Sequence, residues 1–416
     1  MTAKMRVDAL AMIDAIIGEN MPDESVQKAL RARSFPDGIR VVAIGKAAWT
    51  MAKAASDCLG AKIAKGVVIT KYGHSRGDIP GMEIFEAGHP TPDENSVTAT
   101  RKALDLVGGL KEGDEVLFLV SGGGSALFEA PMDGVSLDDL AARTGELLAS
   151  GADIVEINTI RKRLSRVKAG RFAEICGPAK IFSIVLSDVL GDRLDSIASG
   201  PAAPDMTTAA DALAVAEKRG LRLTELQRDC LARETPKRAD NAEIVVTGSV
   251  RSLCESAARA AKARGYEPYI LTTVLNCEAA EAGKFLSAIA ADARDGIGAF
   301  QRPCAIIAGG ETVVRVKGTG KGGRNQELAL SVAKGISALE NVLVFSLGSD
   351  GTDGPTDAAG GIVDCSTAAK LRDLGIDVDK LLAENDSYNG LKAADALIVT
   401  GPTGTNVNDV SVVLCG

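Results

Sequence analysis

Short apolar runs that each end in a glycine or polar cluster are the feature that most limits how this chain can fold. Ile39–Ile44 precedes Gly45-Lys46, Val116–Val120 precedes Ser121–Ser125, and Ile181–Leu186 precedes Ser187-Asp188. Similar runs lie at residues 67–70, 244–247, 270–273, 305–308 and 343–347. Runs that are apolar at almost every position, with helices between them, predict buried and largely parallel strands. Ligands of such sheets bind at the carboxyl ends of the strands, so the polar clusters become candidate site residues.

Helical patterns separate many of these runs and indicate the domain organisation. They cover residues 49–59, 96–107, 137–149, 157–175, 251–263, 279–293 and 326–339. A further strand over 311–316 followed by a glycine-rich loop indicates a mixed sheet in the second half. The 416 residues predict two or three domains at roughly 150 residues each. Because the charged segment 221–241 is the best boundary, we expect two α/β/α domains: residues 1–238 with a Rossmann-like parallel sheet, and residues 239–416 with a mixed sheet.

Composition narrows the class of protein. A net charge of -8 and a pI near 5.1 speak against a nucleic-acid binder. Only two histidines are present, which speaks against a metal site made of His and Cys. The eight cysteines include no CxxC pair and suit free thiols in a reducing compartment. No secretory pattern or membrane-spanning run is seen, so we expect a cytoplasmic protein that binds no membrane.

The first two candidate motifs follow neighbouring apolar runs. In Ser121-Gly122-Gly123-Gly124-Ser125, three glycines allow consecutive N–H groups to point into one concavity that binds phosphate. The alternative is a tight turn between two core elements. Leu127 stands where the dinucleotide fingerprint needs its last glycine, so this is not a GxGxxG motif. Lys46 could neutralise a carboxylate or a transferring phosphate, or it could be a solvated lysine.

Carboxylates at the ends of later runs suggest a metal or a base. Asp188 directly follows a buried strand and could bind Mg²⁺ or accept a proton from a hydroxyl. Asp192 and Asp195 could act similarly or cap a helix. In the second half, Glu311 follows two glycines, and a glycine-bearing loop carries the three carboxylates Asp350, Asp353 and Asp357. Such a loop suits Mg²⁺ with water and phosphate oxygens, or it could be a chain of Asx-turns.

Three further segments carry candidate groups. Gly322 and Gly323 open onto a helix that starts with Arg324 and Asn325, where amides could hold a nucleotide and Arg324 a carboxylate or phosphate. The alternative there is a mobile surface hairpin. Residues 400–409 are too rich in glycine and polar side chains for an ordinary terminus. The basic segment 161–168 is expected to form a solvated helix face, or to supply one cation to a cleft.

Taken together, these motifs resemble the glycerate 2-kinase family, which combines a DUF4147 domain with a C-terminal MOFRL domain. Its members are sometimes labelled hydroxypyruvate reductases. The resemblance extends from about Lys46 to the C-terminus, with small departures at Arg163, where a histidine is expected, and at Ala169, where a glycine is expected. It rests on seven segments and a further loop: SGGGSAL (Ser121–Leu127), LSDVLGD (Leu186–Asp192), IASGP (Ile197–Pro201), GGET (Gly309–Thr312), GGRNQE (Gly322–Glu327), GTDGPTDAAG (Gly351–Gly360), TGPTGTNVND (Thr400–Asp409) and HPTPDENS (His89–Ser96).

The resemblance implies an enzyme that uses ATP and Mg²⁺ to phosphorylate D-glycerate at its 2-hydroxyl. It also implies an active site in the cleft between the two domains, with Lys46 and Arg324 facing the substrate. With the roles argued above, the expected catalytic residues are Lys46, Asp188 and Arg324. The expected nucleotide-binding residues are Ser121, Gly122, Gly123, Gly124, Ser125, Gly322, Gly323 and Asn325, and the expected metal ligands are Asp188, Glu311, Asp350 and Asp353.

Two other functions fit the same fold class. An α/β protein could be an NAD(P)H-dependent hydroxypyruvate reductase. This chain lacks the GxGxxG fingerprint of such an enzyme, and hydride transfer does not need the acidic loop. A non-enzymatic module that binds phosphorylated ligands would use Lys46 and Ser121–Ser125, but not the carboxylates. The sequence leaves the oligomeric state open.

Overall fold

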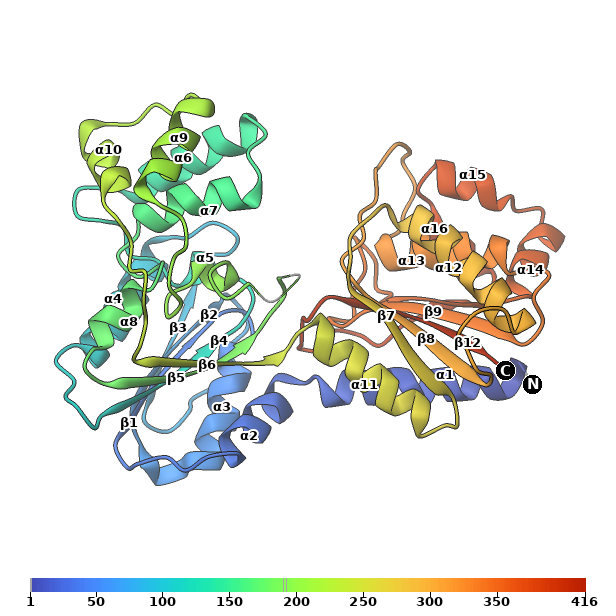
Figure 1. Cartoon of the computed structure of the whole chain (residues 1–416), viewed down its shortest axis with the longest axis horizontal. Coiled ribbons are helices and arrows are strands. Elements are labelled where there is room, and N and C mark those ends of the chain that lie inside the picture. The colour runs from blue at the N-terminus through green and yellow to red at the C-terminus, as the bar shows by residue number, and fades with distance from the viewer. Residues whose placement is uncertain (1, 190, 192) are drawn as a thin grey trace. The chain divides into compact units, whose positions relative to one another are not determined.

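The structure is a computed structural model, and it describes residues 2–189, 191 and 193–416. Its contacts divide the chain into two units, Pro22–Thr247 and the combination of Met1–Met21 with Gly248–Gly416 (Figure 1). This differs from the boundary expected after residue 238. Strand β6 (Ala242–Gly248) is an edge strand of the first sheet, so the first unit continues beyond that point.

The N-terminal helix α1 (Thr2–Glu19) also belongs to a different unit than the sequence suggested. Asn20, which follows it, donates from Nδ2 to Ser256 Oγ at 2.7 Å, and the Tyr266 hydroxyl donates to Asp8 Oδ2 at 2.9 Å. Both partners lie beyond residue 248, so long-range contacts fix the assignment of this helix.

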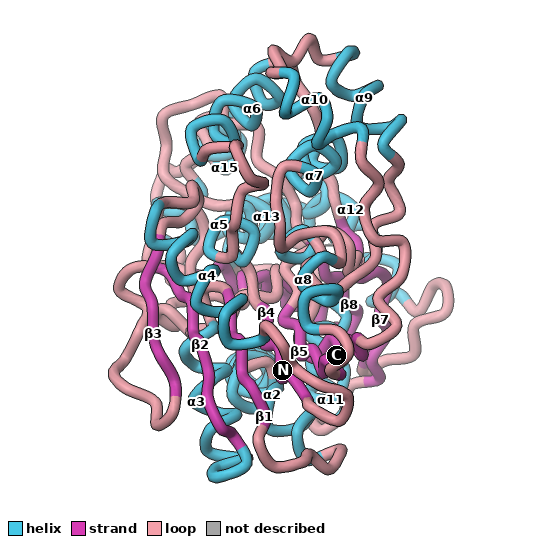
Figure 2. The backbone as a smooth tube through the Cα atoms, turned by 90° about the vertical axis from the view of Figure 1, so that its left-hand side faces the viewer, coloured by secondary structure: helices cyan, strands magenta, loops and turns pink. Residues whose placement is uncertain are grey.

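The unit Pro22–Thr247 contains a six-stranded sheet in the order β3-β2-β1-β4-β5-β6 (Figure 2). Its first five strands are β1 (Ile39–Ile44), β2 (Ile63–Lys71), β3 (Met82–Ala87), β4 (Glu115–Val120) and β5 (Lys180–Leu186). The pairings among these five are parallel. The chain runs outward from β1 to β3 and then returns to place β4 beside β1. This reversal of strand order is where α/β sheets bind their ligands.

Alternate residues of β1 face opposite layers of helices. Val41 and Ala43 pack in a cluster with Val26 of α2 (Pro22–Arg31) and Met51 of α3 (Ala48–Leu59). Val42 and Ile44 pack instead with residues of α4 (Glu94–Val107) and α8 (Arg171–Cys176). A strand that is covered on both faces must be apolar at nearly every position, and in β1 only Arg40, near the start of the strand, departs from this. Each such Val or Ile contributes about 1.5–3 kcal/mol by leaving water.

A helical layer with its own core completes this unit. It consists of α6 (Leu137–Ala149), α7 (Ile154–Arg163), α9 (Ala209–Lys218) and α10 (Glu225–Ala232). The predicted single helix over 157–175 is wrong, because α7 ends at Arg163 and α8 begins only at Arg171. Ala169 and Gly170 have φ values of 57° and 79° in the left-handed region, which no α-helix can include. The short elements η1 (Gly60–Lys62), α5 (Gly124–Leu127) and η2 (Ile197–Ser199) lie in the connections.

The second unit contains the mixed sheet that the sequence predicted, in the order β11-β10-β9-β12-β8-β7. Its strands are β7 (Glu267–Leu275), β8 (Cys304–Gly310), β9 (Val342–Gly348), β10 (Gly360–Asp364), β11 (Leu397–Ile398) and β12 (Asp409–Cys415). Strand β12 is antiparallel to both β8 and β9, whereas β7 is parallel to β8. The predicted strand over 311–316 is wrong, since only Val313 forms an isolated bridge there, to Glu278. Strand β8 is already paired on both sides, so the chain that leaves its end has no free strand edge beside it.

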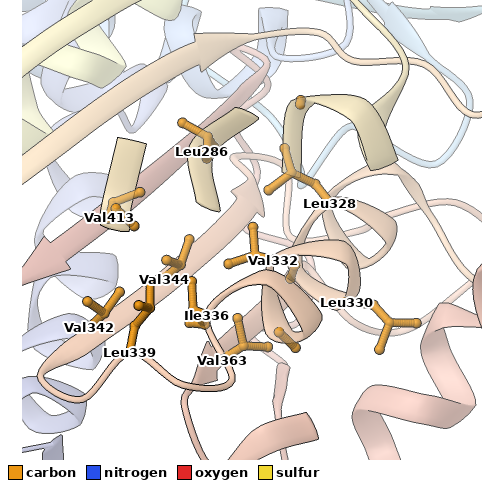
Figure 3. Packing of buried hydrophobic residues seen from close by; sticks show 14 of the residues in the cluster. Leu286, Leu328, Leu330, Val332, Ile336, Leu339, Val342, Val344, Val363 and Val413 are labelled. Atoms are coloured by element: carbon orange, nitrogen blue, oxygen red, sulfur yellow. The ribbon is translucent and has the colours of Figure 1, made fainter. Parts of the chain in front are cut away.

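Helices cover both faces of this sheet. Helices α1 and α11 (Val250–Lys262) lie against one face, and α12 (Ala279–Asp295) and α13 (Arg324–Gly335) against the other (Figure 1). In the core between α12, α13 and the strands, Leu286 and Val332 pack with Val344 and Val413 (Figure 3). Three short helices complete the unit: α14 (Thr367–Asp373), α15 (Val378–Ala383) and α16 (Ser387–Ala393). None of the helices in the described residues is long and apolar enough to cross a membrane.

Candidate functional site

The loops after β1 and β4 are joined by hydrogen bonds at the point where the strand order reverses. The Lys46 amide donates to the Gly122 carbonyl at 2.9 Å, and the Ser121 amide donates to the Ile44 carbonyl at 3.0 Å. The Ala47 amide donates to Ser121 Oγ, also at 3.0 Å. The structure therefore brings together two motifs that lie about 75 residues apart in the sequence, because their strands are neighbours.

The glycines of this junction serve two purposes. Gly45 has a φ of 110°, and a Cβ there would overlap the backbone of Ser121, so only glycine allows the two loops to approach. Gly123 also has a positive φ, at 85°. Within the described part of this unit, the backbone N–H groups of Gly122 and Gly123 take part in no hydrogen bond. Two unused donors on consecutive glycines are what the phosphate-nest interpretation requires.

Cationic and imidazole side chains surround this loop. A Cβ on Gly123 would lie 2.9 Å from the His89 ring and 3.3 Å from Lys46 Cγ, so both side chains border the glycine. The pKa of His89 is lowered, first by burial and then by the charges of Lys46, Lys71 and His74. Among the described residues, neither Lys46 nor Lys71 forms a salt bridge. A group of cations without counter-ions suits an anionic ligand.

Sequence reasoning did not select His89 or Lys71 as site residues. Lys71 ends β2, and His89 follows β3, so both lie at the carboxyl edge of the same sheet. Strand β3 was not predicted, because its pattern of half-buried residues carries two glutamates. If this strand had been predicted, His89 would have been a candidate site residue, because it follows the carboxyl end of the strand.

Asp188 follows β5 and lies against the glycine loop. A Cβ on Gly122 would overlap the Asp188 carboxylate, so the two residues are in close contact. Asp192 lies outside the described residues. Asp195 forms salt bridges with Lys162 at 3.2 Å and Arg193 at 3.1 Å, so its carboxylate serves ion pairing rather than the cap of a helix.

A second candidate site lies entirely within the other unit. It is a cavity of about 530 Å³ between the segment after β8, the start of α13 and the loop after β9. Val313, Val314 and Val316 form an apolar wall, whereas Arg324 and Asp350 contribute charge. Gly322 and Gly323 also line it, as the nucleotide-binding interpretation requires. A cavity of this size lies within the range of small-molecule sites.

Arg324, the first residue of α13, is held by two carboxylates. Its Nε and Nη2 donate to Asp409 at 2.6 and 3.0 Å, and its Nη1 donates to Glu311 Oε1 at 2.8 Å. Burial raises the pKa of Asp409 to about 6. Asp409 begins β12 between the ends of β8 and β9, which is how it reaches both partners. The sequence indicated that residues 400–409 are unusual, but Asp409 was not predicted as a site residue. No local sequence feature links Asp409 to Arg324.

Two residues that were expected to bind ligands form hydrogen bonds within the protein. Asp353 is buried and accepts hydrogen bonds from the amides of Asn325 at 3.2 Å and Gln326 at 2.9 Å. It thereby caps α13, whose own N-cap residue is a glycine without a side chain to do so. Asn325 is also buried, and its Oδ1 accepts from Ser346 Oγ at 2.7 Å. Asp353 lines the cavity, but both of its carboxylate oxygens already accept hydrogen bonds from α13.

The carboxylates of the acidic loop likewise do not point toward one common site. Asp357 accepts a hydrogen bond from the Tyr388 hydroxyl at 2.8 Å, and Asp353 faces α13. Over the described residues, no group of three or more His, Cys, Asp or Glu side chains could hold a metal ion. The three expected metal ligands in this unit all lie at the cavity or beside it, since Asp350 and Asp353 line it and Glu311 contacts the lining residue Arg324.

Comparison with known proteins identifies the family. Residues 8–232 match the family described as "Domain of unknown function (DUF4147)", and residues 304–409 match the MOFRL family. The chain is 54% identical over 404 residues to the D-glycerate 2-kinase of Thermotoga maritima, and the match covers 97% of each chain. The chain belongs to the glycerate 2-kinase family.

Other comparisons agree with this family assignment. The chain is 44% identical to a glycerate 2-kinase of Pyrococcus horikoshii, with 90% of this chain and 87% of that protein covered. The crystal structure of glycerate kinase from Thermotoga maritima matches with a TM-score of 0.97 at 53% identity and covers both chains completely. The resemblance and the α/β fold class inferred from the sequence are thus confirmed. Lys46, Ser121–Ser125 and Asp188 fall in the DUF4147 region, and Glu311, Arg324 and Asp409 fall in the MOFRL region.

Proposed function

We propose that this chain transfers a phosphoryl group from ATP to the 2-hydroxyl of D-glycerate, with Mg²⁺, and releases 2-phosphoglycerate. The observation that carries the proposal is the junction of Lys46 with the Ser121–Ser125 loop, in a member of the glycerate 2-kinase family. Phosphoryl transfer requires positioning and neutralisation of charge, with little covalent chemistry from the protein. Over the part of the chain that the structure describes, the junction offers amides without hydrogen bonds and lysines without salt bridges for both tasks.

In this proposal the loop binds a phosphate group. The free amides of Gly122 and Gly123 donate to its oxygens, and Lys46 neutralises the charge that develops during transfer. Because the pKa of His89 is lowered, the ring is neutral at pH 7 and contributes a hydrogen bond rather than another charge. Asp188, in contact with Gly122, is our candidate for the base that accepts the proton of the 2-hydroxyl.

The cavity beside α13 is our candidate for part of the nucleotide site. Gly322 and Gly323 line it, and the valine wall suits the apolar face of a base. Arg324 points its charge at this region while Asp409 and Glu311 fix its orientation. We propose that Arg324 stabilises the transferring group or binds the glycerate carboxylate.

The residues present fit Mg²⁺ in the way this ion is usually bound by kinases. Mg²⁺ keeps several waters and takes one or two carboxylates together with phosphate oxygens, so it does not need a cluster of three acids. Asp350 borders the cavity, and within the described residues only its Oδ1 accepts a side-chain hydrogen bond, from the Thr352 amide at 3.0 Å. We propose Asp350 as a ligand of Mg²⁺, with Glu311 and Asp188 as further candidate ligands. The bound ion would neutralise phosphate charge. Asp353 fits this role poorly while it caps α13.

The class of ligand and the cellular location are also proposals. We infer an enzyme of small molecules rather than of nucleic acid, supported by the net charge of -8. We infer a cytoplasmic location, supported by the eight free thiols.

The test is to incubate the purified protein with ATP, Mg²⁺ and D-glycerate and to identify the product by ³¹P NMR. We expect 2-phosphoglycerate, no product without Mg²⁺, and a fall in kcat/KM of about 10²–10³ in Lys46→Ala and in Arg324→Ala. Lys53→Ala, which removes an exposed lysine of the neighbouring helix, should be unaffected. Absence of a phosphorylated product, together with NAD(P)H oxidation on adding hydroxypyruvate, would replace the kinase with a reductase.

A further inference from the structure

The basic segment 161–168 is buried, contrary to the solvated face that its sequence suggested. Lys162, Arg163 and Lys168 expose at most 2% of their side chains. Buried charges are retained only when they are paired or when a ligand compensates them. The partner of each cation in this segment therefore indicates whether that cation has a structural role or is available to a ligand.

Three of these cations have carboxylate partners within the protein. Lys162 contacts Asp205 at 3.2 Å, and Arg163 contacts the same carboxylate at 3.6 Å. Lys168 contacts Glu129 at 2.6 Å, with both side chains inaccessible to water. These pairs have a structural role, since each charge is matched where it lies.

Arg161 is the exception among the buried or half-buried cations of the segment. In the described residues it forms no salt bridge, and its one hydrogen bond runs from Nη2 to the Ser125 carbonyl at 3.5 Å. The carboxylate that acts on it electrostatically is Glu129, which Lys168 already neutralises. Arg161, Lys168 and Glu129 together thus carry one positive charge in excess. Most of the five N–H donors of this guanidinium are unused.

Arg161 also lies next to the glycine loop. Ser125, whose carbonyl it contacts, is the last residue of that loop, and Ser125 Oγ hydrogen-bonds to Ser199 Oγ at 2.9 Å. Ser199 in turn donates to Asn158, one turn before Arg161 on α7. Lys46 borders the same loop at Gly123. Two cations without a salt bridge in the described residues therefore border this loop, Lys46 at its middle residue and Arg161 at its last.

We propose that Arg161 is a second cation of this anion site and binds an oxyanion of the ligand together with Lys46. The inference rests on the proposed function for the identity of the ligands. A guanidinium presents parallel donors to a phosphate or a carboxylate, which a lysine cannot do. The group bound by Arg161 is then either a phosphate of the nucleotide or the carboxylate of glycerate, two sources of the same chemistry.

The experiment measures binding of ATP, D-glycerate and 2-phosphoglycerate separately by calorimetry, alongside steady-state kinetics. Arg161→Gln should weaken the ligand whose oxyanion it binds on the order of 10- to 100-fold, and Arg161→Lys should recover only part of this. Weakening of ATP alone assigns the phosphate, and weakening of D-glycerate alone assigns the carboxylate. The matched control is Arg166→Gln in the same segment, where an exposed arginine pairs with Asp133.

The outcomes separate this inference from the proposed function. If Arg161→Gln lowers the melting temperature but leaves every dissociation constant and KM at the wild-type value, Arg161 only balances Glu129 and the inference is overturned. If the wild type binds the ligands and Arg161→Gln weakens them without any turnover in either protein, the inference holds and the kinase assignment fails. If the wild type binds none of the three ligands, both are overturned.

Discussion

The buried pair of Lys168 and Glu129 allows a stability prediction whose magnitude follows from the structure. Both side chains are inaccessible, the Nζ–Oε2 distance is 2.6 Å, and Glu129 Oε1 has no hydrogen-bond partner in the described residues. Lys168→Met keeps the length of the side chain but leaves a buried carboxylate without its counter-ion. Such a loss costs about 3–5 kcal/mol. A unit of this size loses roughly 2–4 °C per kcal/mol, so the melting temperature should fall by about 6–20 °C.

The assay is thermal unfolding followed by circular dichroism, with a double-mutant cycle. Glu129→Gln in the Lys168→Met background should restore part of the loss, because the uncompensated charge is then gone. Arg166→Gln is the control, since its exposed pair with Asp133 contributes at most about 1 kcal/mol. The reasoning is refuted if Lys168→Met shifts the transition no more than this control does, or if the double variant is as unstable as the sum of the single ones.

Three further predictions concern groups near the two candidate sites. Asp353→Ala should lower the free energy of unfolding by about 2–4 kcal/mol in urea titrations, because the first amides of α13 lose a buried acceptor; an unchanged value would contradict its capping role. Burial raises the pKa of Asp409 to about 6, so the native state keeps a proton that the unfolded chain has released between pH 4 and 6. The contribution of this group to stability should therefore fall as the pH rises through that window, and Asp409→Asn should remove this part of the slope. The pKa of His89 should rise when ATP binds, because the anion offsets the neighbouring positive charges; histidine NMR with His74→Asn for assignment measures this, and a pKa unmoved at saturating ATP would argue against an anion at this loop.

The central strands of both sheets were largely predictable because they are buried on both faces. The apolar run over Ile39–Ile44 became β1 with the same bounds, and Val116–Val120 became β4 with one residue added. Strand β3 was missed because it is only half-buried and carries polar residues. The helix over 157–175 was predicted too long, since its apolar periodicity continues through a turn that Ala169 and Gly170 impose.

The sequence by itself determined the fold class, the family and the positions of the polar clusters at strand ends. These depend on local signals: apolar runs, glycines and motifs read along the chain. The tertiary structure alone decided which clusters meet, because β4 returns to the side of β1 and joins Lys46 to the Ser121–Ser125 loop. It also decided which charges are structural. Asp353 caps a helix, Asp409 holds Arg324, and Lys168 is buried against Glu129, because the partner of a charge is set by long-range packing that no local pattern records.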